Sequence, residues 1–135
     1  MKIRFIFLLA CLLSTAAVAQ DDSWKPYALS QSGNLQQLRE DRTVKESDDV
    51  FLVWTKTTYN KPYSTMKNGG PPFSTYSVER LRVDCRNNTS QSLADVYYGK
   101  DGTVLNSYYT PAMPQVIVPD TVGEALLKAV CVFGR

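Results

Sequence analysis

Two cysteines, Cys85 and Cys131, constrain the fold of this chain more than any other feature of its sequence. The third cysteine, Cys11, lies in an N-terminal segment with the features of a signal peptide, so two remain in the mature chain. An even number of cysteines in an exported domain indicates a disulfide, because thiols are oxidised outside the cytoplasm. A Cys85–Cys131 bridge would close a loop of about 46 residues, for which chain entropy predicts a stabilisation of about 4 kcal/mol. Two free thiols are the alternative.

The N-terminus predicts export. Lys2 and Arg4 form a short basic region, an apolar run covers residues 5–13, and the Ala-Val-Ala sequence at residues 17–19 is a small-residue cleavage site. The apolar run is shorter than the roughly 18 residues needed to span a bilayer. We therefore predict a cleaved signal peptide over residues 1–19, a single domain over residues 20–135, and a location in the periplasm or on the outer surface of a Gram-negative-type bacterium. An uncleaved membrane anchor and lipidation at Cys11 are the alternatives.

The mature chain carries no net charge, because removal of residues 1–19 leaves thirteen basic and thirteen acidic side chains. A neutral chain argues against general nucleic-acid binding, which draws its affinity from phosphate neutralisation. The charge is nevertheless uneven, since residues 50–86 hold six bases and two acids. This excess predicts a modest basic patch, with solvated strand edges as the alternative.

Histidine is absent from the whole sequence. Its absence removes the commonest general base near neutral pH and excludes catalysis by Ser-His-Asp or Cys-His groups. No zinc-ligand spacing or Gly-rich phosphate loop occurs either, so no metal or cofactor is expected. The acids Asp84, Asp95, Asp101 and Glu124 are scattered along the chain, and we predict that the protein is not an enzyme.

Most of the mature chain favours β-structure. Residues 24–29 suggest an edge strand, and residues 35–39 fit a strand or a helical turn equally well. Residues 50–54 are apolar on both faces, as in a central strand, and residues 75–85 alternate with Leu81, Val83 and Cys85 on the inner face. Between these runs, residues 60–73 contain prolines and glycines that predict a long loop.

Two further sequence patterns predict a β-hairpin and a C-terminal helix. Residues 93–98 and 103–109 are joined through Asp101-Gly102, which predicts a hairpin that places Tyr97-Tyr98 near Tyr108-Tyr109. Packing between these tyrosines is expected, with a ligand-stacking platform as the alternative. After a short strand at residues 116–118, apolar residues recur at helical spacing over residues 122–133, behind a possible capping box of Thr121 and Glu124. The helix would dock on the sheet, where Cys131 can reach Cys85.

Short motifs are spread over most of the mature chain: Trp24, Asp41-x-Thr43-Val44-Lys45, Trp54, Val83-Asp84-Cys85, Tyr97-Tyr98, Lys100–Leu105, Val118-Pro119-Asp120, Gly123-Glu124 and Val130-Cys131. In the order and spacing of these motifs the sequence resembles the surface-adhesin protein E family. The resemblance implies an α+β fold, with a twisted antiparallel sheet of about five to six strands, one C-terminal amphipathic helix and a disulfide between them, often as a homodimer. A tryptophan frequent in that family is replaced near Met113-Pro114-Gln115.

This resemblance also implies an adhesin-like binding protein whose partner is a protein of the host extracellular matrix. A periplasmic inhibitor or immunity protein acting on an envelope-targeted enzyme is the alternative function. The apolar strand at residues 50–54 favours self-association, with a monomer closed by loops as the alternative. The partner is expected to contact the predicted loop and the exposed arginine face through Lys56, Lys61, Tyr63, Lys67, Arg80, Arg82 and Arg86.

Overall fold

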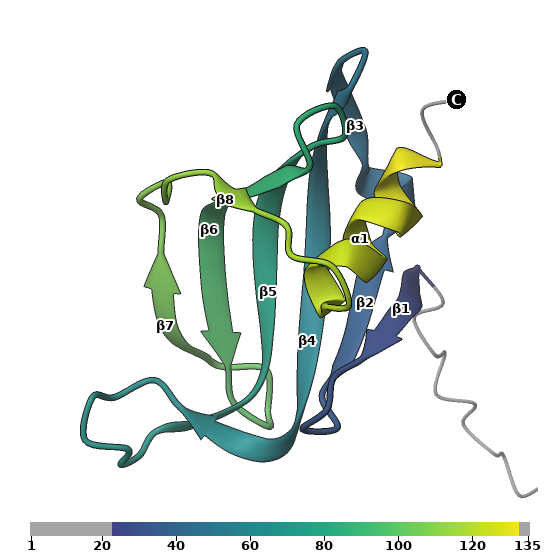
Figure 1. The fold of residues 1–135 in the computed structure, drawn as a ribbon. Coiled ribbons are helices and arrows are strands. Elements are labelled where there is room, and N and C mark those ends of the chain that lie inside the picture. Colours follow the sequence, from purple (N-terminus) through teal and green to yellow (C-terminus); the bar gives the residue numbers. More distant parts are fainter. Residues whose placement is uncertain (1–22, 133–135) are drawn as a thin grey trace, which may run out of the picture.

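The computed structural model describes residues 23–132. The predicted signal peptide over residues 1–19, with Cys11, lies outside the described residues, as does Phe133 at the expected end of the helix. Over the described range the chain forms one antiparallel sheet with a single helix packed across one of its faces (Figure 1). The predicted α+β class is therefore confirmed.

The sheet has eight strands, more than the five to six expected from the sequence. Six of them follow the order β1-β2-β4-β5-β6-β7, while the short β3 pairs with β4 and the two-residue β8 pairs with β6. These two additional pairings account for the difference. The strands are β1 (Trp24–Leu29), β2 (Leu35–Arg39), β3 (Val44–Ser47), β4 (Val50–Ser64), β5 (Phe73–Asp84), β6 (Thr89–Tyr98), β7 (Val104–Tyr108) and β8 (Gln115–Val116), and a 3₁₀ turn, η1 (Glu40–Arg42), precedes β3.

The predicted loop over residues 60–73 is wrong in extent. Strand β4 continues to Ser64, and β5 begins at Phe73. Pairing between the two strands shifts after Thr58 and resumes at Tyr63, so Pro62 lies in the irregular stretch. Proline is tolerated there because no ladder hydrogen bond requires its missing N–H group.

The core lies between the helix and the middle of the sheet. Alternate residues of β4 and β5 are buried under the helix, as the alternation at residues 75–85 predicts. The helix α1 (Val122–Cys131) contributes the other side of the core. The buried apolar side chains are Leu38, Phe51, Val53, Leu81, Val83, Leu126 and Val130.

The predicted cap of the helix is present. Thr121 Oγ1 accepts a hydrogen bond from the Glu124 N–H at 3.4 Å, and Glu124 Oε2 accepts one from the Asp120 N–H at 3.1 Å. The second bond lies one residue before its usual place in a capping box. Both bonds satisfy donors at the start of the helix and fix the direction in which it crosses the sheet.

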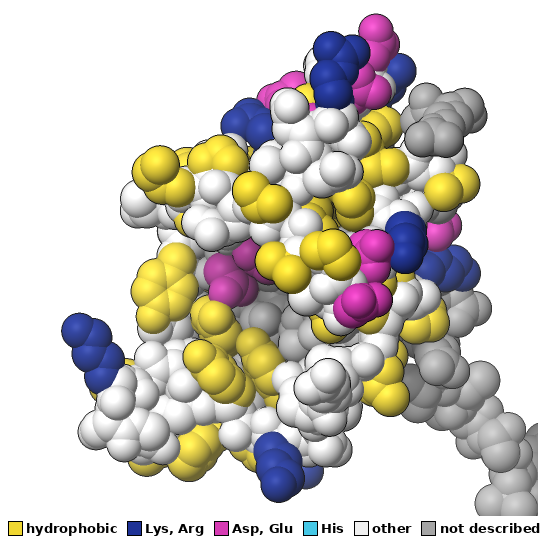
Figure 2. All heavy atoms as spheres, viewed as in Figure 1, with side chains coloured by type: hydrophobic (Ala, Val, Ile, Leu, Met, Phe, Trp, Pro, Cys, Tyr) yellow, Lys and Arg dark blue, Asp and Glu magenta, His cyan; other side chains and the backbone are white. Residues whose placement is uncertain are grey.

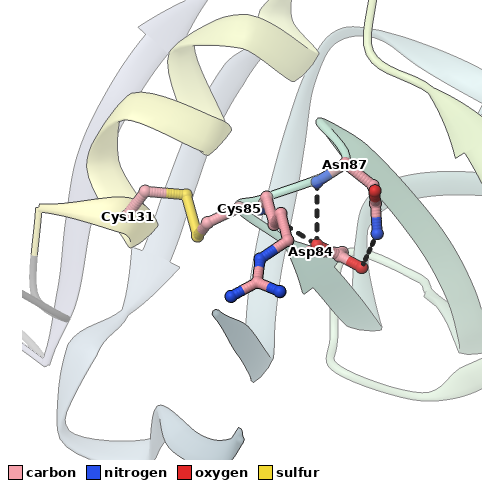
Figure 3. The surroundings of a disulfide bond; sticks show 5 residues. Asp84, Cys85, Asn87 and Cys131 are labelled. Carbon is pink, nitrogen blue, oxygen red and sulfur yellow. Dashed lines mark hydrogen bonds between the residues drawn. A yellow bond between two sulfur atoms is a disulfide. The ribbon is translucent and has the colours of Figure 1, made fainter. Parts of the chain in front are cut away.

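The Cys85–Cys131 disulfide joins the end of the helix to the residue that follows β5, with 5.8 Å between the Cα atoms (Figure 3). Asp84 holds the adjoining turn, because its Oδ1 accepts hydrogen bonds from the Asn87 and Arg86 N–H groups at 2.9 and 3.0 Å. The bond from the Asn87 backbone is the main reason that the pKa of Asp84 is lowered. The disulfide is therefore attached to a turn that is itself held by hydrogen bonds.

The double variant Cys85→Ser/Cys131→Ser should unfold at a lower urea concentration than the parent. We expect a loss of about 2–4 kcal/mol in the free energy of unfolding, because an unbridged chain gains loop entropy when it unfolds. Urea unfolding with and without reductant measures this. The reductant should shift the parent curve and leave that of the variant unchanged; equal parent and variant midpoints would contradict the stabilising role.

Candidate functional site

The two faces of the sheet differ in cover. The helix crosses one face, over the β1, β2 and β4 side (Figure 1). On the opposite face, which we call the open face, no helix of residues 23–132 covers the sheet. Its side chains alternate in the strands with the buried core residues. The open-face residues discussed below are Trp24, Arg39, Trp54, Lys56, Tyr76, Arg80, Arg82 and Tyr98.

A row of alternating aromatic rings and cations crosses the open face. The Arg39 guanidinium lies 5.6 Å from the centre of the Trp24 ring. Lys56 Nζ lies 5.8 Å from the same ring and 5.1 Å from the Tyr76 ring. Tyr76 stacks in turn on Tyr98 of the next strand at 4.7 Å. These distances are within the range of cation–π attraction, so each cation is held over a ring.

Trp54 and Arg80 form a second pair on the same face. They are direct partners in the β4–β5 register, and the guanidinium lies 5.7 Å from the Trp54 ring. Neither Arg80 nor Lys56 takes part in an ion pair among the described residues. Their positive charges are thus available to a partner.

Arg82 differs from these two cations. It makes two hydrogen bonds with the carboxylate of Glu46, at 2.8 and 2.9 Å. Arg82 is the main cause of the lowered pKa of Glu46, and the charge of Arg80 contributes less. Since Glu46 compensates it, Arg82 adds little to the net charge of the open face.

The structure separates the residues that the sequence proposed as one contact surface. Lys56, Arg80 and Arg82 lie together on the open face. Lys61, Tyr63 and Lys67 belong instead to the far end of β4 and the turn that follows it. Arg86 lies beyond the end of β5 and pairs with Asp49 at 2.8 Å, so it does not continue the arginine face.

Sequence reasoning missed the aromatic half of the site. The alternation of β4 and β5 could have placed Trp54 and Arg80 on one face, but their pairing follows from the register.

A shallow cavity of about 280 Å³ also forms where β1, β2, β4 and β5 come together. It is lined by Trp24, Arg39, Arg42, Trp54 and Val78.

The helix-covered face contains a second feature, a hollow of about 280 Å³ beside the start of the helix. Figure 2 shows acidic atoms recessed in this face between hydrophobic side chains. Glu79 lines the hollow, and Asp95 is its direct partner on β6. Asp95 is the one candidate carboxylate of the sequence that the fold places opposite another acid, and Glu79 was not anticipated.

Burial raises the pKa of Glu79, and the neighbouring charge of Asp95 raises it further. Burial also raises the pKa of Asp95, although a hydrogen bond with Tyr97 partly offsets the effect. The Oδ1 atom of Asp95 is buried and has no hydrogen-bond partner within residues 23–132. This acidic pair therefore opposes the folded state at neutral pH.

Four tyrosines pack beside the acidic pair. Tyr63 stacks between Tyr59 and Tyr97, at 5.1 and 5.9 Å between ring centres, and Tyr108 meets the edge of Tyr97 at 6.1 Å. Packing of Tyr97 with Tyr108 across the hairpin is thus confirmed. Tyr98, by contrast, points to the open face and stacks on Tyr76.

Along residues 23–132, no three acidic or cysteine side chains are grouped so that they could hold a metal ion.

Glu79→Gln should raise the free energy of unfolding at pH 7 by about 0.5–1 kcal/mol, the usual scale for like charges facing each other across two strands. The folded-state pKa is raised, so the destabilisation develops as the pH rises through the unfolded value near 4 and is complete above the folded value. The gain should vanish below about pH 4.

Urea unfolding at several pH values tests this prediction. Glu40→Gln removes an exposed carboxylate and serves as the control. If both variants followed the pH dependence of the parent, the acidic pair would not be destabilising.

The fold and the open face together define a class: a small sheet-and-helix domain, joined by a disulfide, that displays an aromatic and cationic surface. The sequence matches the surface-adhesin protein E family over residues 24–132, and the chain belongs to this family. The family is one of surface adhesins. Within residues 23–132, no helix is long and apolar enough to cross a membrane.

Solved structures similar to this fold include protein E of Haemophilus influenzae. Its crystal form II has a TM-score of 0.64 at 8% identity, with 83% of this chain and 89% of that chain covered. Protein E from non-typeable Haemophilus influenzae has a TM-score of 0.57 at 7% identity, with 85% and 79% covered. No curated protein matches the sequence. These identities are low, so the likeness is one of fold.

Proposed function

We propose that this protein is exported, displayed on the bacterial surface, and binds a host extracellular-matrix protein through the open face. The row of cations and rings carries this proposal. Lys56 and Arg80 are uncompensated charges held over aromatic rings on the two central strands. Tryptophan, tyrosine and arginine are the residue types that dominate binding energy at protein interfaces. Membership of an adhesin family supports the same conclusion.

The face also has the rigidity that a contact surface needs. Lys56, Tyr76 and Arg80 stand on β4 and β5, which are paired on both sides, and the rings limit the movement of the cations. A partner therefore loses less free energy in ordering this surface than it would at a loop. The far end of β4 with Lys61 and Tyr63, together with Lys67 in the turn that follows, is a second candidate contact region.

Lys56→Gln/Arg80→Gln should weaken capture of immobilised host matrix by about tenfold or more, because both uncompensated cations are lost. Surface plasmon resonance on matrix proteins measures this effect. Lys61→Gln/Lys67→Gln removes the same charge from the far end of β4 and the turn that follows it, and serves as the matched control. If both double variants lost the same affinity, binding would depend on the overall positive charge and not on the open face. If only Lys61→Gln/Lys67→Gln lost affinity, the binding site would lie at the end of β4 and the turn after it.

Surface display separates adhesion from the alternative of a periplasmic inhibitor or immunity protein. Protease added to intact producing cells should degrade the protein while a periplasmic marker is protected. Protection of the protein would favour the periplasmic alternative. The homodimer implied by the family stays a prediction, which analytical ultracentrifugation of the mature chain can check.

A further inference from the structure

The cations of the open face are only partly paired with carboxylates. Arg82 is matched by Glu46. Arg39 and Arg42 share one carboxylate, that of Asp41, at 3.2 and 3.7 Å. Lys56 and Arg80 form no ion pair among the described residues, so these two charges are available to an anionic ligand although the mature chain is neutral.

These cations also stand on neighbouring strands. Arg39, Lys56 and Arg80 come from β2, β4 and β5, which are consecutive in the sheet. Leu38 pairs with Thr55 and Trp54 with Arg80, so Arg39 and Arg80 lie on either side of Trp54, whereas Lys56 lies two residues along β4, opposite Val78. The three charges therefore form a cluster across neighbouring strands. Each cation is placed over a ring, Arg39 and Lys56 at Trp24 and Arg80 at Trp54. A cluster of cations held over rings on three strands suits a ligand that carries several anions along a short length of chain.

The geometry disfavours two other kinds of linear acidic ligand. An extended acidic peptide would need a free strand edge, whereas β2, β4 and β5 are interior strands with paired backbones. Single-stranded nucleic acid needs free rings on which bases stack. Tyr76 is already occupied by Lys56 and Tyr98, and the two tryptophans carry cations.

The cavity on this face suits a sugar with an oxyanion. Its walls are the rings of Trp24 and Trp54 and the guanidinium groups of Arg39 and Arg42. A guanidinium fork binds an oxyanion through two parallel hydrogen bonds, and the indole rings form an apolar wall of the cavity beside these groups. We propose that the open face binds a sulfated polysaccharide chain of the kind that matrix proteoglycans carry. This inference rests on the proposed function and names the part of the partner that is recognised.

Binding of the mature protein to immobilised heparin, a highly sulfated polysaccharide, tests the proposal. Arg39→Gln, Lys56→Gln and Arg80→Gln should each raise Kd about 3–10-fold and lower the slope of log Kd against log salt by about one. Lys25→Gln and Lys100→Gln are the matched controls, because both are exposed and neither forms an ion pair among the described residues. Neither control should change Kd by more than about twofold.

Competition in solution identifies the ligand class. Heparin should displace the protein, whereas desulfated heparin, poly-glutamate and a single-stranded oligonucleotide of equal length should be at least about tenfold weaker. The proposal is overturned if heparin does not bind, if the three open-face variants bind like the controls, or if poly-glutamate or the oligonucleotide competes equally well. Melting curves of each variant establish that the fold is retained.

The outcomes also separate this inference from the proposed function. Loss of matrix capture in Lys56→Gln/Arg80→Gln without any heparin binding would leave the adhesin proposal standing and remove the polysaccharide. Heparin binding through the open face without capture of whole matrix would support the polysaccharide inference and contradict the adhesin proposal. Treatment of the matrix with heparinase should abolish capture if both are correct.

Discussion

The packing of one short helix on one face of the sheet, held by the Cys85–Cys131 bridge, determines how the rest of the structure is arranged. A single helix forms a core with seven buried apolar side chains. A core of this size is marginal for a domain of this length, so a covalent link between its two layers is a substantial part of the stability. The opposite face of the sheet has no such cover and must be stabilised in another way.

On the open face, rings and cations replace a second layer. Trp24, Trp54 and Tyr76 each have the head of a lysine or arginine over the ring, which shields aromatic surface while the charge stays near water. The open face is therefore neither strongly hydrophobic nor fully hydrated. Because its rings are partly covered, this face can stay exposed to water in the free protein and can also serve as a binding surface.

The limited length of the helix explains the second unusual region. Ten helical residues extend about 15 Å, whereas six paired strands span about 24 Å. The side of the sheet formed by β6 and β7 is consequently covered by tyrosines instead of the helix. Glu79 and Asp95 face each other at this boundary, where they are too buried to be well hydrated.

Local patterns in the sequence were enough to predict the helix with its Thr121 cap, the β6–β7 hairpin, the inner face of β5 and the bridge between the two cysteines. Each depends on residues close in the chain or on the chemistry of a few side chains. Only the tertiary structure decided that Trp54 lies opposite Arg80, that Glu79 lies opposite Asp95, and that Arg86 leaves the arginine face. Such contacts depend on strand register, which is set by core packing and by irregularities such as the shift after Thr58. A shift of one residue exchanges the two faces, so no local pattern could determine which side chains meet across the strands.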